Sequence, residues 1–391
     1  MLTNVGAIEI CAEDRDIHTT NKRRQVGVFR LMEPNCLIRA KNNNTSWKVT
    51  VIEKRIPFLV RLTTSDLGVN TYRIPILKSL PDGSLIALSE GRKYNSADVG
   101  PKFLAMRRST DQGLTWSNTT FIEDDGEDPD GLNLGTVFVD EEKNRVFVIY
   151  SHCATKCVYH TTFLISSDDF GLTWTNPSNL SDQIGSSVFL PGPGFGIQKK
   201  KDPHKGRLIT CGHSHPGHDG VFCIVSDDHG TSWRVAGYIL QQGSFEPDES
   251  QLIELYDGNL LMTSRNQDNF HCHCRIMSKS YDGGESFAHS DIYFDEALLD
   301  PVVAASLLRY RNTVYFSNPA SKLFRINMTV RWSEDNGESW VGSLGVWKGP
   351  SGYSCLTTIP GTQANNTFIG MVFEKGVTRY YESIAFVRLR L

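Results

Sequence analysis

The stretch Ser109–Trp116 reads STDQGLTW, and its spacing of Ser, Asp, Gly and a closing aromatic residue recurs four times further along the chain. The later copies are Ser167–Trp174, Ser226–Trp233, Ser280–Phe287 and Ser333–Trp340. Their glycines stand at positions 113, 171, 230, 284 and 337, so successive copies are 58, 59, 54 and 53 residues apart. Five copies at a near-constant period indicate an internal repeat, in which each period forms one supersecondary unit.

Each copy carries the residues of a tight turn between two strands. The Asp carboxylate can accept hydrogen bonds from backbone N–H groups, and the Gly two positions later takes a positive φ without steric cost. The aromatic residue that ends each copy is expected to anchor the turn in a core. Each period is therefore predicted to be a small antiparallel sheet. The turns themselves are interpreted as architecture and not as part of a reaction site.

The repeats resemble the Asp boxes of β-propellers. One further period fits before the first copy and another after the last. The chain is therefore predicted to be an all-β, six-bladed β-propeller of four-stranded antiparallel blades with Asp-box turns. The propeller is assigned to residues 61–391. Residues 1–60 lie outside the repeats, and their strand-like runs Lys48–Ile52 and Phe58–Val60 are candidates for one strand of the last blade.

The overall composition excludes several classes of protein. The 391 residues include 40 Lys and Arg against 44 Asp and Glu, and this balance shows no electrostatic footprint for nucleic acid. The hydrophobic fraction of 39% and the charged fraction of 21% are typical of a globular protein. No run approaches the roughly 18 apolar residues that a membrane-spanning helix requires.

The nine cysteines leave at least one thiol without an intramolecular partner. Cys211 and Cys223 flank a hairpin-like stretch and could be neighbours. The run His271–Cys274 looks like a metal-binding sequence, but alternation on a strand would place its cysteines and its histidines on opposite faces. Tetrahedral zinc would need further ligands. The candidates for those ligands are His152, Cys153 and Cys157. Buried thiols or disulfides are preferred over zinc.

Signals for cellular location point in two directions. The first residues, Met1–Gly6, have neither the basic segment nor the apolar core of a signal peptide. Six Asn-x-Ser/Thr sequons nevertheless favour a protein of the secretory pathway. They are centred on Asn43, Asn44, Asn118, Asn179, Asn327 and Asn365.

Several stretches between residues 70 and 385 resemble the sialidase (neuraminidase) superfamily, most closely its animal lysosomal branch. They are Tyr72–Pro75, Asp130–Gly135, Pro191–Gly194, Asn266–Gln267, His271–Ile276, Asp300–Ala305 and Gly349–Ser354. The resemblance implies a glycoside hydrolase that removes terminal sialic acids from glycoproteins, oligosaccharides or gangliosides. It implies no metal and no organic cofactor.

The proposed substrate explains why arginines matter in this resemblance. Sialic acid carries a carboxylate on its anomeric carbon, and planar guanidinium groups bind a carboxylate bidentately without losing their charge. The family uses three arginines from separate blades, which the resemblance maps to Arg73, Arg265 and Arg325. Glu374 resembles the acidic residue that orients the first arginine.

The substrate carboxylate also explains an unusual nucleophile. It would repel an attacking Asp or Glu, whereas a neutral phenol avoids this repulsion once a nearby carboxylate removes its proton. The resemblance assigns the nucleophile to Tyr353 and its base to Glu249, although Glu246 and Asp248 could compete for the role of base. It assigns the general acid to Asp98, which must then be protonated when substrate arrives, through a raised pKa or acidic surroundings.

Two further residues complete the predicted site. Arg92 and Asp130 occupy positions that in related enzymes contact the 4-hydroxyl or the N-acetyl group of the sugar ring. The whole set predicts a retaining exo-α-sialidase with a covalent tyrosine intermediate. One alternative is a trans-sialidase, which shares these residues but needs an aromatic platform for its acceptor sugar. Another is a propeller that binds sialylated glycans without cleaving them, which would not need the acid, the phenol and its base.

The resemblance also carries expectations about location and partners. It implies the lysosomal lumen or another secretory or extracellular site. However, the chain ends in Phe386–Leu391 without the tyrosine-based sorting tail of the lysosomal relatives. It implies a protective partner of the cathepsin A type, and it leaves homo-oligomerisation open. Neither nucleic acid nor a transmembrane segment is expected.

Overall fold

A computed structural model describes residues 36–42, 45–55, 68–154, 159–185, 188–214, 220–267, 271–361 and 367–390. Regular structure in these ranges is almost entirely β. The two helical segments among the described residues are α1 (Ser181–Ile184) and the 3-10 turn η1 (His289–Asp291). Neither is long and apolar enough to span a membrane.

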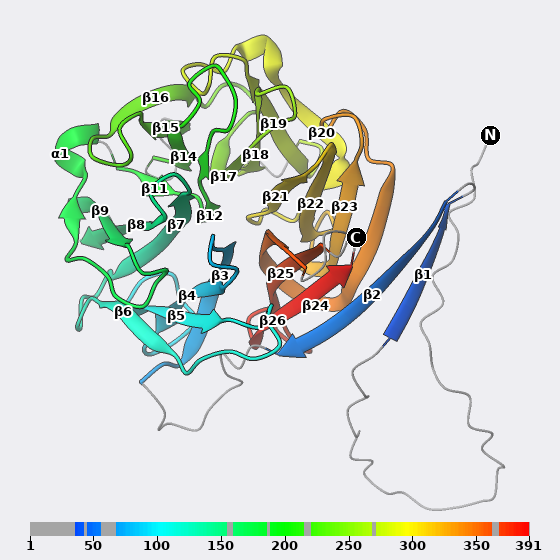
Figure 1. Cartoon of the computed structure of the whole chain (residues 1–391), viewed down its shortest axis with the longest axis horizontal. Helices are drawn as coiled ribbons and strands as arrows, with labels where there is room; N and C mark the ends of the chain where they lie inside the picture. The colour runs from blue at the N-terminus through cyan, green and yellow to red at the C-terminus, as the bar shows by residue number, and fades with distance from the viewer. Residues whose placement is uncertain are drawn as a thin grey trace, which may run out of the picture.

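The strands form sheets arranged around a central axis, as expected for a propeller (Figure 1). The first sheet contains β3 (Thr71–Ser79), β4 (Leu85–Arg92), β5 (Lys102–Ser109) and β6 (Thr120–Asp124). The second contains β7 (Leu132–Asp140), β8 (Arg145–Ala154), β9 (Tyr159–Ser167) and β10 (Ser178–Asn179), with β12 (Gly194–Phe195) parallel to β7. The third contains β14 (Leu208–His213), β15 (Val221–Ser226) and β16 (Arg234–Ile239), with β11 (Leu190–Pro191) and β13 (Ile197–Gln198) on β14. The fourth contains β17 (Pro247–Glu254), β18 (Leu260–Asn266), β19 (Cys274–Ser280) and β20 (Ile292–Leu299).

The predicted count of six blades is wrong, because the described strands form five sheets. The fifth has eight strands: β21 (Ser306–Tyr310), β22 (Thr313–Pro319), β23 (Ile326–Ser333), β24 (Gly342–Ile359), β25 (Phe368–Lys375), β26 (Ser383–Arg390), β2 (Thr45–Arg55) and β1 (Cys36–Asn42). Strand β24 is 18 residues long. Its first half pairs with β23 and its second half with β25. Its continuous backbone thus joins two sets of strands that the repeat period assigns to separate blades.

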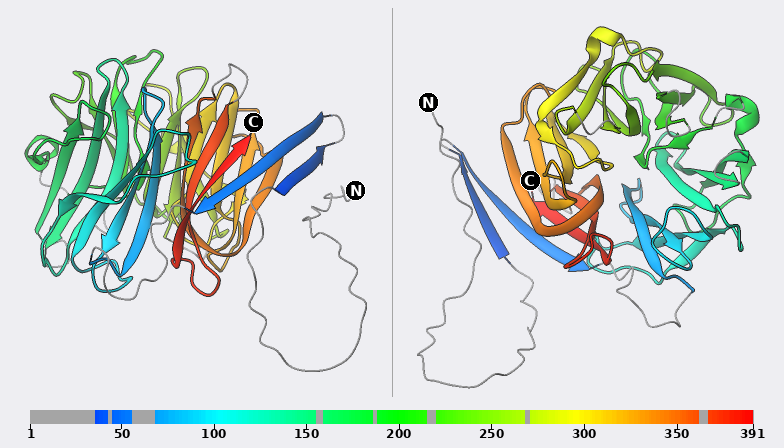
Figure 2. Two further views of the ribbon diagram at one scale, coloured as in Figure 1. Left: turned by 60° about the horizontal axis from the view of Figure 1, so that its bottom comes forward. Right: turned by 180° about the vertical axis from the view of Figure 1, so that it is seen from behind.

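The N-terminal strands lie at the edge of this large sheet. Strand β2 pairs with β26, and β1 pairs only with β2. Figure 2 shows the two strands extending away from the ring, which is seen more from the side in its left-hand view. The other candidate run before the repeats, Phe58–Val60, lies outside the described residues.

All five repeats form the same hydrogen-bonded turn, which begins at the ends of β5, β9, β15, β19 and β23. In the first copy, Gly113 N donates to Ser109 Oγ at 2.9 Å, while Thr115 N and Oγ1 donate to the Asp111 carboxylate at 2.8 and 2.5 Å. The other four copies repeat this pattern with their own residues. Because antiparallel neighbours alternate in direction, these turns lie at the end of the sheets opposite to the start of β3 and the end of β4.

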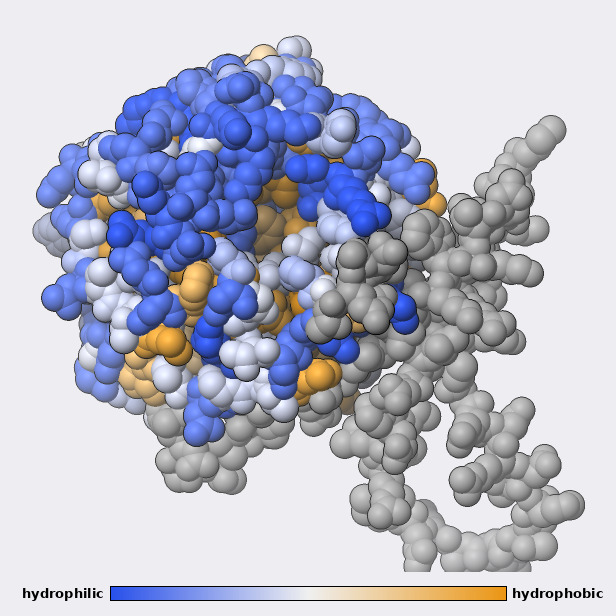
Figure 3. All heavy atoms as spheres, viewed as in Figure 1, coloured by the Kyte–Doolittle hydropathy of each residue, from blue (hydrophilic) through white to orange (hydrophobic). Residues whose placement is uncertain are grey.

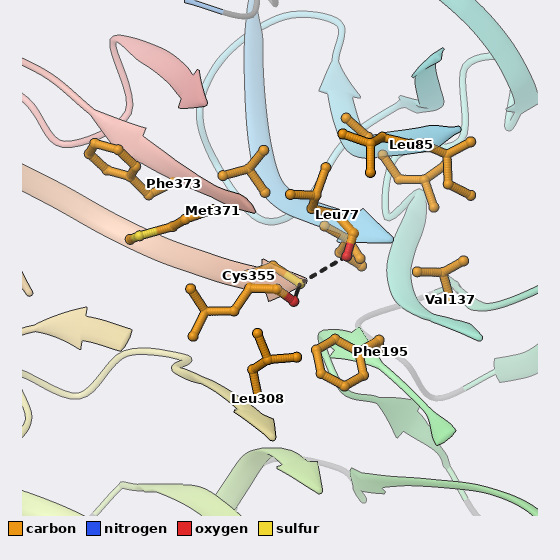
Figure 4. Packing of buried hydrophobic residues seen from close by; sticks show 14 of the residues in the cluster. Leu77, Leu85, Val137, Phe195, Leu308, Cys355, Met371 and Phe373 are labelled. Atoms are coloured by element: carbon orange, nitrogen blue, oxygen red, sulfur yellow. Dashed lines mark hydrogen bonds between the residues drawn. The ribbon is translucent and has the colours of Figure 1, made fainter. Parts of the chain in front are cut away.

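Buried side chains from several sheets meet between the strands (Figure 4). They include Leu77, Leu85, Val137, Phe195, Leu308, Cys355, Met371 and Phe373. The thiol of Cys355 is free and buried, and burial raises its pKa to about 11. The face in Figure 3 is mostly hydrophilic, with apolar residues visible towards its middle. The core is therefore formed by apolar side chains of the strands, and not by helices packed on the sheets.

Disulfide bonding of the cysteines argues against a metal site in the run His271–Cys274. Cys272 is bonded to Cys274, and Cys211 is bonded to Cys223 on the neighbouring strand. The expected strand alternation through His271–Cys274 is wrong, since β19 begins only at Cys274 and His273 has a φ of 50°. A disulfide removes both thiolates that zinc would need, and the described residues contain no cluster of three or more metal-ligating side chains.

Candidate active site

The strand register breaks beside four of the predicted site residues. The breaks fall between Arg73 and Ile76, between Pro247 and Ser250 around Glu249, just after Arg325, and between Ser351 and Ser354 around Tyr353. A bulge of this kind bends the strand and turns its side chains away from the regular alternation. Ile74 marks the first bulge with a φ of 58°, which is rare for a β-branched residue.

Glu374 links the first bulge to the last. Its Oε1 accepts hydrogen bonds from Arg73 Nε at 2.5 Å and from Ile74 N at 3.1 Å, and its Oε2 accepts one from Tyr353 N at 3.1 Å. Gly352 permits this approach, because a Cβ there would lie 2.1 Å from Glu374 Oε2. Burial alone would lower the pKa of Arg73, but the charge and hydrogen bond of Glu374, together with Tyr353 and Tyr380, outweigh it and the pKa is raised. Arg73 is therefore a fixed cation.

Tyr353 and Glu249 form a direct pair. The Tyr353 hydroxyl donates to Glu249 Oε1, and Arg265 Nη1 donates to Glu249 Oε2 at 2.8 Å. Burial raises the pKa of Tyr353 well above its usual value, and the charge of Glu249 adds to this, although three arginines oppose it. Burial would raise the pKa of Glu249, but Arg265 and the Tyr353 hydrogen bond keep it below its usual value. The pair thus joins a neutral phenol to an ionised carboxylate.

The contacts given by the structure for the two competing acidic residues do not involve the Tyr353 hydroxyl. Asp248 Oδ1 lies 3.1 Å from His213 Nδ1, and its Oδ2 accepts a hydrogen bond from Gln267 Nε2. The backbone N–H of Glu246 donates to Asn266 Oδ1 at 3.1 Å. Geometry therefore selects Glu249 as the carboxylate that contacts Tyr353.

The three predicted arginines gather around the Tyr353 ring. The Cζ atoms of Arg73 and Arg325 each lie 5.6 Å from its centroid, and Arg265 reaches its partner Glu249. Arg325 Nη2 also donates to Val302 O at 2.9 Å. The three come from β3, from β18 and from the segment just before β23, so distant parts of the chain meet here. A dense group of guanidinium charges is a fitting receptor for a carboxylate.

Asp98, the predicted general acid, lies beside Arg73 and Arg92. Its side chain is 84% exposed, and its Oδ1 lies 2.8 Å from Arg92 Nη1 and 4.0 Å from Arg73 Nη1. Although the Asp98 side chain is exposed to solvent, partial desolvation by the surrounding protein would raise its pKa, but the charges of Arg92 and Arg73 and the hydrogen bond from Arg92 together lower the pKa. The two arginines thus favour the ionised form of Asp98, whereas a general acid must be protonated when substrate arrives.

The sequence reading did not identify Glu90, which holds Arg92 in place. Glu90 Oε2 accepts from Arg92 Nε at 3.0 Å and Nη2 at 2.8 Å, while its Oε1 accepts from Leu134 N at 3.0 Å. The stretch Ser89–Arg92 offered one signal, since Glu90 and Arg92 are two positions apart on β4 and therefore lie on one face of it.

Asp130, the last predicted site residue, lies half-buried in the loop before β7. A Cβ on the neighbouring Gly131 would lie 2.1 Å from Gly100 O, so this loop packs closely on the loop of Asp98. Its role in substrate binding stays a prediction. Of the sequons, Asn118, Asn179 and Asn327 are exposed, and Asn43, Asn44 and Asn365 lie outside the described residues.

Comparison with known proteins shows which family the chain belongs to. The profile of the family described as BNR repeat-like domain matches residues 83–366. The chain belongs to the BNR repeat-like domain family. A sialidase of Micromonospora viridifaciens is 31% identical over 352 residues, which are 80% of this chain and 52% of that protein. The chain thus spans about half the length of this relative, and the match supports membership of the sialidase superfamily.

Solved structures of a sialidase and of a trans-sialidase share the fold of this chain. The Hadza microbial sialidase Hz136 matches with a TM-score of 0.70 at 24% identity, covering 92% of this chain and 74% of that one. The intramolecular trans-sialidase of Ruminococcus gnavus matches with a TM-score of 0.72 at 17% identity, covering 86% and 98%. At these identities the likeness shows the β-propeller fold. The relatives named here are microbial, so closeness to the animal lysosomal branch stays a prediction.

Proposed function

We propose that the chain is a retaining exo-α-sialidase that hydrolyses terminal sialic acids through a covalent tyrosine intermediate. The hydrogen-bonded pair of Tyr353 and Glu249, placed among three arginines, carries this proposal. The arginines suit a sugar with a carboxylate on its anomeric carbon, and the phenol suits attack beside that negative charge. The lysosomal location and the cathepsin A-like partner rest on the sequence stretches alone.

The proposed reaction gives each of these side chains one task. The arginines bind the substrate carboxylate, and Asp98 donates its proton to the leaving oxygen as the glycosidic bond breaks. The Tyr353 oxygen forms a bond to the anomeric carbon while its proton passes to Glu249. Water then attacks the same carbon from the opposite face, gives its proton to Asp98, and the Tyr353 oxygen recovers the proton from Glu249. Two inversions leave the configuration retained.

Capture of the intermediate tests the proposal directly. A sialosyl fluoride with a second fluorine beside the anomeric carbon slows both steps through its electron withdrawal, but its good leaving group keeps the first step accessible. We expect the intact protein to gain the mass of one sialosyl group, and peptide mapping to place it on Tyr353. The Asp98→Asn variant should still be labelled, because fluoride leaves without a proton donor. Labelling of Glu249 in place of Tyr353 would contradict the mechanism.

The trans-sialidase alternative shares the same first half-reaction. The Tyr380 and Tyr381 rings pack edge to face and lie 5.3 and 5.6 Å from Arg73 Cζ, which supplies aromatic surface beside the site. Incubation of an α-sialoside with lactose separates the two reactions. Release of free sialic acid supports hydrolysis, and sialyllactose as the main product supports transfer.

The low pKa of Asp98 predicts a pH dependence. A general acid works only when protonated, so kcat/KM should fall as pH rises through the Asp98 pKa of the free enzyme. Arg92→Gln removes a lowering charge and should move this alkaline limb to higher pH. Bound substrate brings its carboxylate to Arg73, so the limb of kcat should lie at higher pH than that of kcat/KM. Arg145→Gln, which breaks an exposed pair with Asp168, is the matched control and should leave both limbs in place. An unchanged limb in Arg92→Gln would remove Asp98 as the acid.

A further inference from the structure

One exposed apolar turn lies directly beside the arginine cluster, in residues 320–325 between β22 and β23. The side chains of Leu323 and Phe324 are 70% and 65% exposed. Their backbone N–H groups both donate to Ser321 Oγ, at 3.4 and 3.3 Å. The next residue, Arg325, turns inward to Val302 and the Tyr353 ring. The backbone is thus held in a turn that presents two large apolar side chains to solvent.

A second turn, residues 376–382 between β25 and β26, has the same character. Val377 at its tip is 80% exposed. The Glu382 carboxylate accepts hydrogen bonds from the N–H groups of Val377, Thr378 and Arg379 at 2.9, 2.9 and 2.8 Å. These donors, Val377 first, lower the pKa of Glu382. A fixed carboxylate therefore holds an apolar side chain outward, although burial of that side chain would be favoured in water.

The two turns, named here the apolar turns, are neighbours. Ser351 N donates to Arg325 O at 2.8 Å, and Gly376 N donates to Pro350 O at 3.0 Å. Both turns therefore flank the same short segment of β24, next to the Tyr353 bulge. Arg325 Cζ lies 4.9 Å from the Tyr380 ring, which joins the turns again near the cluster.

Exposed apolar side chains also occur on another segment beside the cluster. The loop that carries Asp98 exposes Tyr94 and Val99. Arg73 connects this loop to the second apolar turn, since its Nη1 lies 4.0 Å from Asp98 Oδ1 and its Cζ lies 5.3 Å from the Tyr380 ring. Exposed apolar side chains on several segments around one cluster suit a broad surface better than a single peptide in a groove.

The charges of the apolar turns indicate which kind of surface these turns would bind. Lys322 precedes Leu323 and is exposed, and Arg379 follows Val377 by two residues and is exposed. The single acidic residue in either turn is Glu382, whose carboxylate is already hydrogen-bonded to three N–H groups. The chain as a whole has a formal net charge of −4, so this local cationic character runs against the average. Apolar side chains beside basic ones are typical of segments that sit in the headgroup region of an anionic membrane.

We propose that the apolar turns dock this end of the molecule on an anionic lipid surface, with Leu323, Phe324 and Val377 inserted among the headgroups. Docking would present the arginine cluster to sugars attached to lipids, so the preferred substrates are sialylated glycolipids in a bilayer. The substrate part of this statement rests on the proposed sialidase function. The docking part does not.

Sedimentation of the full chain with vesicles tests the docking without any substrate. Vesicles of phosphatidylcholine with phosphatidylserine should bind the chain, vesicles of phosphatidylcholine alone should bind it less, and added salt should weaken the binding. The variant Leu323→Ser/Phe324→Ser/Val377→Ser should bind about tenfold or more weakly. Leu172→Ser is the matched control, because Leu172 is 68% exposed in a repeat turn at the opposite end. It should bind like the unaltered chain.

Catalytic assays then separate the two proposals. The triple variant should lose turnover of a sialylated glycolipid in these vesicles and keep turnover of a soluble α-sialoside. The single variant Val377→Ser, which is remote in sequence from Arg325, should show the same pattern to a smaller degree. Equal vesicle binding by the triple variant and the unaltered chain would overturn the docking proposal. So would absence of vesicle binding, including a case where the apolar turns instead mediate self-association. Vesicle binding without turnover of any sialoside would overturn the proposed function and leave the docking intact.

Discussion

Replacing Tyr353 by phenylalanine is expected to lower kcat on a soluble α-sialoside by about a thousandfold or more, with little change in KM. The substitution removes only the hydroxyl that donates to Glu249. The ring stays, and with it the contacts to the Arg73 and Arg325 guanidinium groups. The carboxylate of the substrate should therefore still bind, while the bond to the anomeric carbon can no longer form.

Initial rates across a range of substrate concentrations give the two constants separately. Tyr380→Phe is the matched control, because the Tyr380 ring also lies beside Arg73 and Arg325, whereas the Glu249 carboxylate accepts hydrogen bonds from Tyr353 and Arg265. Glu249→Gln should be nearly as slow as Tyr353→Phe, and the double variant no slower than the worse single one, since both act in one proton transfer. A kcat for Tyr353→Phe within tenfold of the unaltered enzyme would exclude the phenol as nucleophile.

Only part of the candidate site could be predicted from the sequence. Tyr353, Glu249 and the arginines were found because each stands in a short stretch that resembles a known family. Their convergence could not be derived from those stretches, because it depends on bulges that turn single side chains off the strand alternation. Ile74, at a φ of 58°, is an example that no propensity would predict. The three hydrogen bonds of Glu374 could not be derived from the sequence either, since they join β3 to β24, which are far apart in the chain.

The error in the number of blades has a physical cause that local sequence does not reveal. The repeat period correctly places the five turns, but a period counts turns and not sheets. Continuous pairing through β24 merged two predicted blades into one sheet. The direction of the Asp98 pKa could not be derived from local sequence either. A general acid must be protonated when substrate arrives, through a raised pKa or acidic surroundings, and the folded site brings Arg92 and Arg73 to Asp98, where their charges lower its pKa.

Replacing Glu374 by alanine is expected to lower the free energy of unfolding by about 3–5 kcal/mol, because it leaves the buried Arg73 guanidinium without its charged partner. Both side chains are almost fully buried, at 0% and 5% exposed. The N–H groups of Ile74 and Tyr353 would lose their acceptor as well. Glu374→Gln should cost less, because the amide oxygen can still accept hydrogen bonds although the charge is gone.

Urea unfolding followed by circular dichroism measures the loss, and Glu334→Ala, at an exposed position of a repeat turn, is the control that should change it little. Kinetics show whether Glu374 also positions Arg73. If it does, Glu374→Gln should fold and raise KM for the sialoside more than it lowers kcat, because the displaced guanidinium binds the substrate carboxylate less well. A Glu374→Gln variant with unchanged KM would make the residue purely structural. The bulges of Arg73 and Tyr353 would then be held by packing, and the ion pair would contribute stability without orienting the arginine.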